Sequence, residues 1–246
     1  IDRPISRVVM GSMVFRPDNA PYACALLDHF YELGGNCIDT AWIYGTEAAI
    51  GQWLRLRGVR DEMVLIGKGA HTPECNPEAL TRQLYQSLER LQTDRLDLYF
   101  MHRDNPAIPA GEFVEVLNEH LRAGRMRAFG GSNWSIARIE EANAYARERG
   151  LVGFTVSSPN LALAAWNEPM WPGCVAASDA VSRAWYERQQ MPIFAWSSQA
   201  SGMLTGRYQP EDRSDPALAA IVRTWFNEGN FQRLARAQEL ARKKGV

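Results

Sequence analysis

The chain lacks several features that would point directly to a function. No apolar run is long enough to span a membrane, and no basic-then-apolar signal sequence opens the chain, so no membrane partner is expected. There is no G-x-G-x-x-G and no P-loop, which argues against a nucleotide held on a Rossmann turn. The four cysteines have no C-x-x-C spacing, so metal and disulfide sites are not predicted and a reducing cytoplasm is the expected compartment.

The chain also lacks a net charge of either sign. Its formal charge is −1, which creates no field for attracting nucleic acid or anionic lipid. What it has is a composition of 46% apolar and 22% charged residues over a length of 246, enough to fill one large core. The composition indicates one soluble globular domain, and it leaves the oligomeric state open.

Strand and helix patterns alternate along the sequence. Short, nearly continuous apolar strands separated by helices are typical of a parallel sheet covered on its outside. We expect strands at Arg7 to Ser12, around Ile38, around Ile66, at Leu96 to Met101, Met126 to Gly131, Gly153 to Ser157 and Pro192 to Ser197. Helices are expected at Pro21 to Leu33, Glu47 to Leu56, Pro77 to Leu91, Gly111 to Ala123, Ser135 to Arg149, Ser178 to Arg188 and Asn230 to Lys244.

The predicted strand count stops at seven. A closed eight-stranded barrel removes sheet edges, whereas seven strands leave two edges open. The predicted organisation is therefore one α/β domain over residues 1–246, a (β/α)8 barrel without its eighth strand, in a chain that is a fragment or incompletely represented.

Polar residues follow four successive strands at the point where each ends. Asp39, Lys68, His102 and the pair Ser132-Asn133 are about 30 residues apart, which matches one strand–helix–strand unit. In a (β/α)8 barrel the downstream strand ends form the catalytic rim. Tyr44 lies one short turn after Asp39. The spacing predicts that these side chains meet.

The residue types indicate proton transfer to a carbonyl oxygen. Tyrosine is a weak acid with a pKa of about 10, and a nearby lysine ammonium is expected to lower the pKa of Tyr44. Asp39 can orient Lys68, and His102 can donate a hydrogen bond to the same oxygen. The set lacks a nucleophile–base pair, so a reducing equivalent has to come from a cofactor.

These motifs resemble the aldo-keto reductase superfamily. Residues 39–45 read D-T-A-W-I-Y-G, as in its D-T-A-x-x-Y-G motif, and Lys68, His102 and Ser132-Asn133 fall where that family keeps a lysine, a histidine and a Ser-Asn pair. Residues 193–206 and 9–13 are similar to its strand-seven and opening segments. The resemblance implies a (β/α)8 barrel that uses NADPH to reduce an aldehyde, ketone or keto-sugar reversibly to the alcohol.

The resemblance also implies roles for individual residues. Tyr44 is the expected general acid, Asp39 and Lys68 its tuning partners, and His102 the group that orients the carbonyl. The expected cofactor-binding residues are Ser12, Met13, Ser132, Asn133, Trp196, Ser197, Gly202, Met203 and Leu204. Ser132 and Asn133 match the carboxamide site, and Trp196 matches the aromatic residue under the nicotinamide ring.

The sequence departs from the family pattern in two places. Val156 stands where the family has a glutamine four residues before Asn160, so a hydrogen bond to the carboxamide is lost or comes from a serine. The segment that follows strand eight and grips the adenosine 2′-phosphate is absent from the sequence. NADH therefore remains possible beside NADPH.

Four tryptophans are candidates for the substrate pocket. Trp42 and Trp134 adjoin expected catalytic and cofactor positions, so we interpret them as pocket walls. Trp166 and Trp171 lie in a long loop, residues 161–177, which either closes over a sugar-like substrate or packs over the barrel. His29, His71 and His120 are expected to be ordinary structural or surface residues.

Three functions fit these patterns. The first is an NADP-dependent carbonyl reductase with Tyr44 as general acid, and the second is a cofactor-binding regulatory protein of the same fold with little turnover. The third is a lyase that uses Lys68 as a Schiff base, which Tyr44 and Ser132-Asn133 argue against because an imine mechanism needs neither.

Overall fold

The computed structural model describes residues 1, 3–15 and 20–246. Their fold is α/β, with a six-stranded sheet in the order β1-β2-β3-β4-β5-β6. The pairs from β1 to β5 are parallel. The strands are β1 (Met10–Gly11), β2 (Cys37–Asp39), β3 (Val64–Gly69), β4 (Leu96–Met101), β5 (Met126–Ser132) and β6 (Val156–Ser158).

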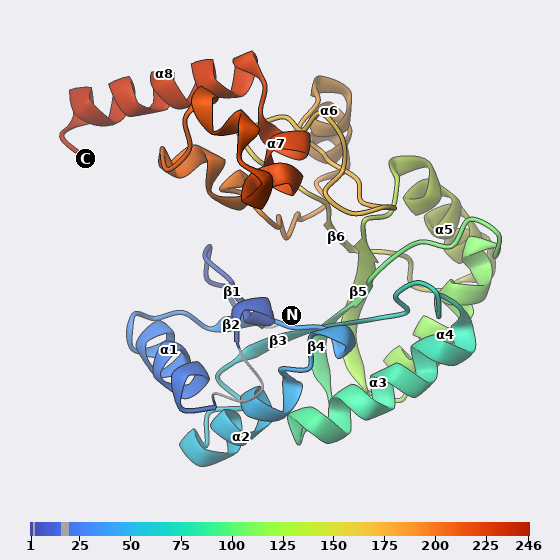
Figure 1. Ribbon diagram of the computed structural model, residues 1–246. Helices are drawn as coiled ribbons and strands as arrows, with labels where there is room; N and C mark the ends of the chain where they lie inside the picture. The colour runs from blue at the N-terminus through green and yellow to red at the C-terminus, as the bar shows by residue number, and fades with distance from the viewer. Residues whose placement is uncertain (2, 16–19) are drawn as a thin grey trace. The chain divides into compact units, whose positions relative to one another are not determined.

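Two compact units make up the chain, Ile1–Ser157 and Ser158–Val246. In the first unit the helices run along the outside of the strands (Figure 1). They are α1 (Ala20–Glu32), α2 (Glu47–Arg57), α3 (Pro77–Leu91), α4 (Ala110–Arg122) and α5 (Ile136–Arg149), with 3-10 turns η1 (Ser12–Val14) and η2 (Trp42–Tyr44). Helix α3 shows why they form: the Asn76 side chain accepts the N–H of Ala79 at 2.8 Å, Pro77 occupies the first turn, and Leu80, Leu84 and Leu88 share the buried face.

The second unit is mainly helical. It contains α6 (Ala180–Gln189), η3 (Ala200–Thr205), η4 (Pro210–Ser214), η5 (Pro216–Leu218), α7 (Ala219–Trp225) and α8 (Glu228–Lys244), the long red helix in Figure 1. Its apolar cluster consists of Ala164, Ala200, Met203, Tyr208, Trp225 and Phe226. Within the described part of the chain, no helix combines the length and apolar character needed to cross a membrane.

Two predicted strands differ from the structure. The strand expected at Arg7 to Ser12 is reduced to Met10–Gly11, because Ser12 already begins a 3-10 turn. The prediction of a strand at Pro192 to Ser197 is wrong. In the described structure this segment has only one isolated β-bridge, between Asn160 and Trp196. The apolar pattern there reports partial burial, whereas a strand also needs a paired neighbour along its length.

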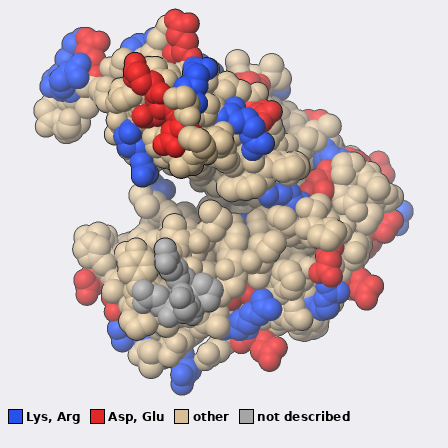
Figure 2. Space-filling model, in the orientation of Figure 1, with Lys and Arg blue, Asp and Glu red and all other residues tan. Residues whose placement is uncertain are grey.

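Charged side chains of both signs are interspersed on the face shown in Figure 2. Charged side chains also form ion pairs, such as Arg82 with Glu74 at 2.7 Å and Arg95 with Asp61 at 2.6 Å. This distribution agrees with the formal charge of −1. The surface in this view carries no large field of one sign.

Candidate active site

Three of the expected catalytic residues lie on neighbouring strands of the first unit. Asp39 ends β2, Lys68 is the next-to-last residue of β3, and His102 follows β4 directly. Lys68 is 3% exposed; its ammonium donates to the carboxylate of Asp39 and, at 2.8 Å, to the carbonyl of Thr40. The apolar strands thus bury a lysine whose charge is paired and whose direction is fixed.

Tyr44 lies on the 3-10 turn η2, and its ring lies near the ammonium group of Lys68. Its backbone N–H donates to the carbonyl of Ala41 at 3.0 Å, and Gly45 after it has a φ of 70°, a left-handed conformation that favours glycine. The Lys68 Nζ atom lies 5.3 Å from the centroid of the Tyr44 ring. The His102 ring stands edge-on to it, with centroids 5.6 Å apart and an interplanar angle of 83°. The four side chains therefore form one cluster.

The ionisation of Tyr44 differs from the sequence expectation. Burial raises the pKa of Tyr44 above its usual value of 10.0, Lys68 opposes that rise, and Asp39 adds to it. The lysine cannot lower the pKa below the usual value because Asp39 neutralises much of its field and desolvation penalises the phenolate. Tyr44 is therefore a protonated phenol throughout the neutral range.

His102 is held as a neutral imidazole. It is 6% exposed, and its backbone N–H donates to the carbonyl of Gly69 at 2.7 Å. Burial, followed by the positive charges of Lys68 and Arg103, lowers the pKa of His102 well below 6.5. Over residues 1, 3–15 and 20–246, no hydrogen-bond partner is found for its buried Nδ1 atom. A neutral imidazole ring carries one N–H. His102 is therefore suited to act as a neutral hydrogen-bond donor, and not as a cation.

Two residues outside the sequence prediction belong to this cluster. The ring of His71, which we had interpreted as structural or surface, stands edge-on to His102 with centroids 4.8 Å apart. Arg103 is 8% exposed and donates to the His102 carbonyl at 3.0 Å. Burial is the main cause of the lowered pKa of both His71 and His102, and the charge of Arg103 lowers both further. The same charge favours the phenolate of Tyr44. Adjacency to His102 in the sequence was the available signal for Arg103, and His71 follows Lys68 by three positions.

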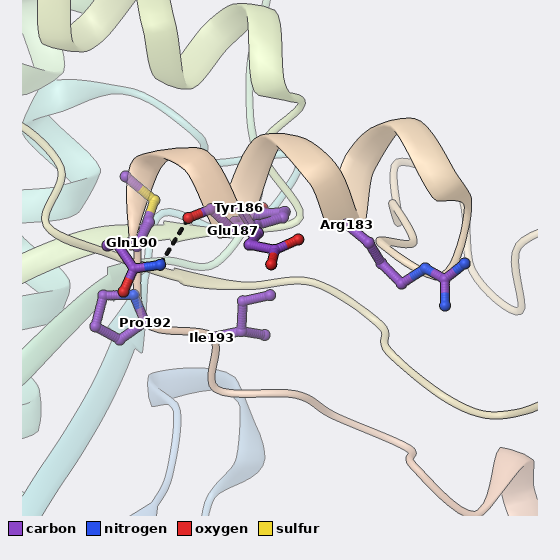
Figure 3. Close-up of a pocket in the computed structure, with 7 residues that line it drawn as sticks. Arg183, Tyr186, Glu187, Gln190, Pro192 and Ile193 are labelled. Carbon is purple, nitrogen blue, oxygen red and sulfur yellow. Dashed lines mark hydrogen bonds between the residues drawn. The ribbon is translucent and has the colours of Figure 1, made fainter.

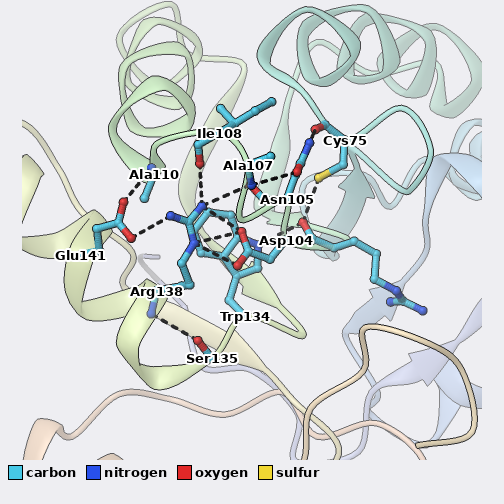
Figure 4. A network of polar contacts seen from close by, with 11 residues as sticks. Cys75, Asp104, Asn105, Ala107, Ile108, Ala110, Trp134, Ser135, Arg138 and Glu141 are labelled. Carbon is cyan, nitrogen blue, oxygen red and sulfur yellow. Dashed lines mark hydrogen bonds and ion pairs between the residues drawn. The ribbon is translucent and has the colours of Figure 1, made fainter.

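The loop after His102 is tied to the start of α5 by Arg138 (Figure 4). The Arg138 guanidinium makes a forked contact with the Asp104 carboxylate at 3.0–3.2 Å, and it donates to Glu141 at 2.7 Å. The guanidinium carbon of Arg138 lies 5.2 Å from the centroid of the Trp134 ring. Both strand-end segments that carry expected site residues are therefore fixed by one partly buried network.

The expected cofactor residues of the first unit occupy strand ends. Ser132 and Asn133 are 2% and 4% exposed at the carboxyl end of β5, next to β4, and the Asn133 amide donates to Ser132 Oγ at 3.0 Å. Asn133 adopts a left-handed φ of 60°, which turns the chain sharply at this point. Ser12 is buried with its hydroxyl 3.0 Å from that of Thr46, whereas Met13 is 61% exposed.

The expected cofactor residues of the second unit have different environments. Trp196 makes the single bridge to Asn160, and Ser197 and Gly202 have left-handed φ angles of 54° and 91°. Met203 is fully buried in the apolar cluster, with Leu204 packed against it. The side chains of Met203 and Leu204 thus belong to the apolar cluster, and the backbone N–H of Leu204 donates to the Gln199 carbonyl at 3.3 Å.

The four tryptophans do not share one environment. Trp42 is half-buried and donates to Gln86 Oε1 at 2.7 Å. Trp134 is 1% exposed, with ring centroids 5.8 Å from Phe113 and 4.7 Å from Phe154. Trp134 is therefore a core residue rather than a pocket wall, because its apolar neighbours enclose it.

The long loop of the second unit is firmly anchored. Asn230 donates to the carbonyl of Ala165 at 2.7 Å, and the backbone N–H of Asn167 donates to that of Thr224 at 2.7 Å. Trp166 packs 6.1 Å from Trp225, between ring centroids, while Trp171 is 46% exposed. These contacts favour the packing interpretation for Trp166.

A separate hollow of about 440 Å³ lies in the second unit beside α6 (Figure 3). It is lined by Arg183, Tyr186, Glu187, Gln190, Met191, Pro192 and Ile193. None of the expected catalytic, cofactor or substrate residues lines it. Gln190 donates to the Glu187 carbonyl at 2.7 Å, so part of its polar lining is already satisfied.

The comparisons with known proteins assign the chain to a family. The model of the aldo/keto reductase family matches residues 7–246, and the chain belongs to that family.

Several curated proteins are similar to the chain. An uncharacterized oxidoreductase, YrpG of Bacillus subtilis, is 29% identical over 82% of this chain and 65% of its own length. The norsolorinic acid reductase stcV of Emericella nidulans is 35% identical over 54% of the chain and 39% of that protein. A probable aryl-alcohol dehydrogenase of Saccharomyces cerevisiae, AAD4, is 32% identical over 60% and 48%. The chain thus spans about two thirds or less of the length of these relatives.

A solved structure confirms the fold class. An aldo-keto reductase from Klebsiella pneumoniae, crystallised in complex with NADPH, aligns with a TM-score of 0.68 and 24% identity over 82% of this chain and 66% of that protein. The predicted (β/α)8-barrel class is therefore confirmed.

Proposed function

We propose that the protein is a carbonyl reductase of the aldo-keto reductase type, which reduces an aldehyde or ketone reversibly to the alcohol with NADPH. One observation carries the proposal: Asp39, Tyr44, Lys68 and His102 form a single cluster at the carboxyl ends of adjacent strands. That edge is the catalytic edge of a (β/α)8 barrel. Family membership and the oxidoreductase names of the relatives support it.

Tyr44 is the proposed proton donor. Its raised pKa keeps the phenol protonated, so the phenol O–H is available to a carbonyl oxygen at neutral pH. As the oxygen gains negative charge, the Tyr44 proton moves to it, and the Lys68 ammonium stabilises the phenolate left behind. The neutral His102 ring donates a second hydrogen bond that orients the carbonyl. Asp39 keeps Lys68 in place.

The side chains of this cluster fit a nicotinamide cofactor as partner. They include acids and hydrogen-bond donors, but none of the four can supply a hydride, which is the chemistry that NADPH supplies when bound. Ser132 and Asn133, beside β4, are the proposed contacts of the carboxamide. In the second unit, Trp196, Ser197 and the backbone around Gly202 are proposed for the rest of the cofactor. We also propose that residues 1–246 belong to one barrel domain; the family model matches residues 7–246.

Aromatic aldehydes and ketones are the proposed substrate class. Relatives named for aryl alcohols and for norsolorinic acid support this choice over the sugar-like substrates expected from the loop tryptophans. The half-buried Trp42 precedes Tyr44 by two residues, and a flat indole there suits an aromatic ring. The packing of Trp166 in the apolar cluster removes one of the groups that had suggested a sugar.

The test is an assay of hydride transfer, in which the loss of NADPH absorbance is the readout. Purified protein is assayed with aromatic aldehydes, aliphatic aldehydes, aromatic ketones and keto-sugars, and NADPH binding is measured separately by tryptophan fluorescence. We expect turnover with the aromatic carbonyls and none without a carbonyl. NADPH binding without turnover on any carbonyl would overturn the enzymatic proposal in favour of a cofactor-binding regulatory protein.

A further inference from the structure

We propose that Arg90 and Gln86, on the outer helix α3, are positioning residues that set the place of the Tyr44 phenol. The inference rests on the proposed function only in taking Tyr44 as the proton donor. Neither residue belongs to the cluster of Asp39, Tyr44, Lys68 and His102. Both instead hold the short segment from Trp42 to Glu47, in which Tyr44 lies.

The first end of this segment is held through Trp42. The indole N–H donates to Gln86 Oε1 at 2.7 Å. The guanidinium carbon of Arg90 lies 5.5 Å from the centroid of the same ring, and Arg90 Nη1 donates to the Trp42 carbonyl at 3.2 Å. Side chain and backbone of Trp42 are therefore both fixed by α3, one helical turn apart on the same face.

The second end is held through Glu47. The same Arg90 Nη1 atom contacts Glu47 Oε2 at 3.3 Å, and the Glu47 side chain is completely buried at the first turn of α2. Thr46, just before it, is 1% exposed, with its hydroxyl 3.0 Å from that of Ser12 and 3.3 Å from that of Thr40. One guanidinium thus connects both ends of the segment that carries Tyr44.

The segment needs external support because its own backbone supplies little. Residues 42–44 form a 3-10 turn of three residues, closed at Tyr44 by the N–H donation to Ala41. Gly45 follows in a left-handed conformation and offers no side-chain contact. Such short turns are weakly determined by local hydrogen bonds. Proton transfer is sensitive to displacement on the scale of about 1 Å, so an outside tether acts on the rate.

An arginine is the suitable residue at position 90. Its planar fork can stack on an indole ring while it donates to a carbonyl and a carboxylate, whereas a lysine offers one compact charge. The exposed fraction of its side chain is 38%, so the group spans from the surface to the buried Glu47 carboxylate. We therefore expect Arg90→Lys to keep the ion pair with Glu47 and lose the stacking on Trp42.

The primary test reads the surroundings of Tyr44 without using activity. The full chain is labelled with 3-fluorotyrosine, and the fluorine resonance of Tyr44 is assigned by its loss in Tyr44→Phe. We expect Gln86→Met to shift or broaden that resonance, because methionine keeps the length of the side chain and removes the acceptor of the indole N–H. Arg90→Lys should do the same. Gln86→Met leaves the buried Glu47 ion pair intact, so the test survives if the Arg90 variant does not fold.

The matched control is Arg82→Gln on the same helix. Arg82 pairs with Glu74 at 2.7 Å on the exposed surface, and within the described part of the chain it makes no hydrogen bond or ion pair with the segment that carries Tyr44. Its substitution should leave the Tyr44 resonance unchanged. A Tyr44 resonance that is identical in wild type, Gln86→Met and Arg90→Lys would overturn the proposal.

Kinetics separate this inference from the proposed function. If the wild type reduces carbonyls, Gln86→Met should lower kcat by about ten- to a hundredfold and leave the dissociation constant of NADPH unchanged. A fall in NADPH affinity with kcat preserved would contradict the positioning role. If the wild type reduces no carbonyl but the Tyr44 resonance moves as expected, the positioning inference stands and the proposed function fails.

Discussion

At the scale of single residues, burial determines which proton each group of the candidate active site carries. Tyr44 and His102 lie beside the same lysine. Tyr44 keeps its phenolic proton because its pKa is raised, whereas His102 stays a neutral imidazole because its pKa is lowered. Both outcomes are the neutral form, because a partly dehydrated site disfavours charge on either group. Lys68 remains the exception, since Asp39 pairs with it directly. The cluster therefore contains one ion pair, Lys68 with Asp39, and two neutral rings, those of Tyr44 and His102.

Lys68 is expected to act through its charge and not through a covalent bond. Its ammonium already has two acceptors, Asp39 and the Thr40 carbonyl, so it is poorly placed to attack a carbonyl carbon. Treatment of the protein with borohydride and an aromatic aldehyde should leave Lys68 unmodified when peptides are analysed by mass spectrometry. A reduced adduct on Lys68 would favour the lyase interpretation instead. The more exposed Lys243 serves as an internal measure of non-specific modification.

The sequence was sufficient to predict that the strand-end residues of the candidate site lie together, but not what surrounds them. Asp39, Lys68 and His102 were accessible because strand ends at a regular spacing meet on one edge of a parallel sheet. His71 was missed because its contact with His102 depends on the path of the loop after β3, which no periodicity describes. The direction of the Tyr44 pKa shift was also missed, since desolvation is a property of the packed site.

At the scale of elements, the sheet depends on a close approach between β5 and β6. A Cβ atom on Gly130 would lie 1.8 Å from the carbonyl oxygen of Val156, so a larger residue requires the backbone to move. We expect Gly130→Ala to lower the free energy of unfolding by more than about 2 kcal/mol. Urea denaturation followed by circular dichroism measures it.

Gly11→Ala is the matched control for Gly130→Ala. Among the residues that the structure describes, no atom lies within 4 Å of a Cβ atom added at Gly11, which also belongs to a strand of the sheet. Its substitution should change the free energy of unfolding by no more than about 0.5 kcal/mol. Equal losses from the two substitutions would show that the contact with Val156 is not the cause.

Helix α3 was easier to predict than the segment Pro192 to Ser197 for a physical reason. The span Pro77–Leu91 was predicted to its end residues, because its proline and its apolar spacing are local signals. The strand expected at Pro192 to Ser197 has one bridge in the structure, because pairing depends on a neighbour distant in sequence. The local apolar pattern indicates which residues are buried, but it does not indicate which strand a segment pairs with.

At the scale of the whole molecule, buried histidines connect stability to pH. The unfolded chain takes up a proton at His102 near pH 6.5, whereas the folded protein keeps this ring neutral to a lower pH. Folding stability should therefore be full above pH 6.5 and fall as the pH drops below it, by up to about 1.4 kcal/mol per pH unit for one such group. Urea midpoints at pH 7.5, 6.5 and 5.5 measure the slope.

A variant isolates the contribution of His102 to that slope. His102→Gln removes the titrating ring, so its stability should fall less steeply than that of the wild type between pH 6.5 and 5.5. The raised pKa of the buried Glu47 acts in the opposite direction near its own range, and it is common to both proteins. Parallel slopes in wild type and His102→Gln would mean that His102 is not held neutral by burial.

The comparison of Tyr44→Phe with the wild type in NADPH-dependent reduction of an aromatic aldehyde tests the proposed chemistry most directly. Phenylalanine keeps the ring beside Lys68 and His102 and removes the hydroxyl group that would donate the proton. We predict that kcat falls by about 10²–10⁴ while the affinity for NADPH stays nearly the same. Turnover close to that of the wild type in Tyr44→Phe would contradict the assignment of Tyr44 as the acid of this site.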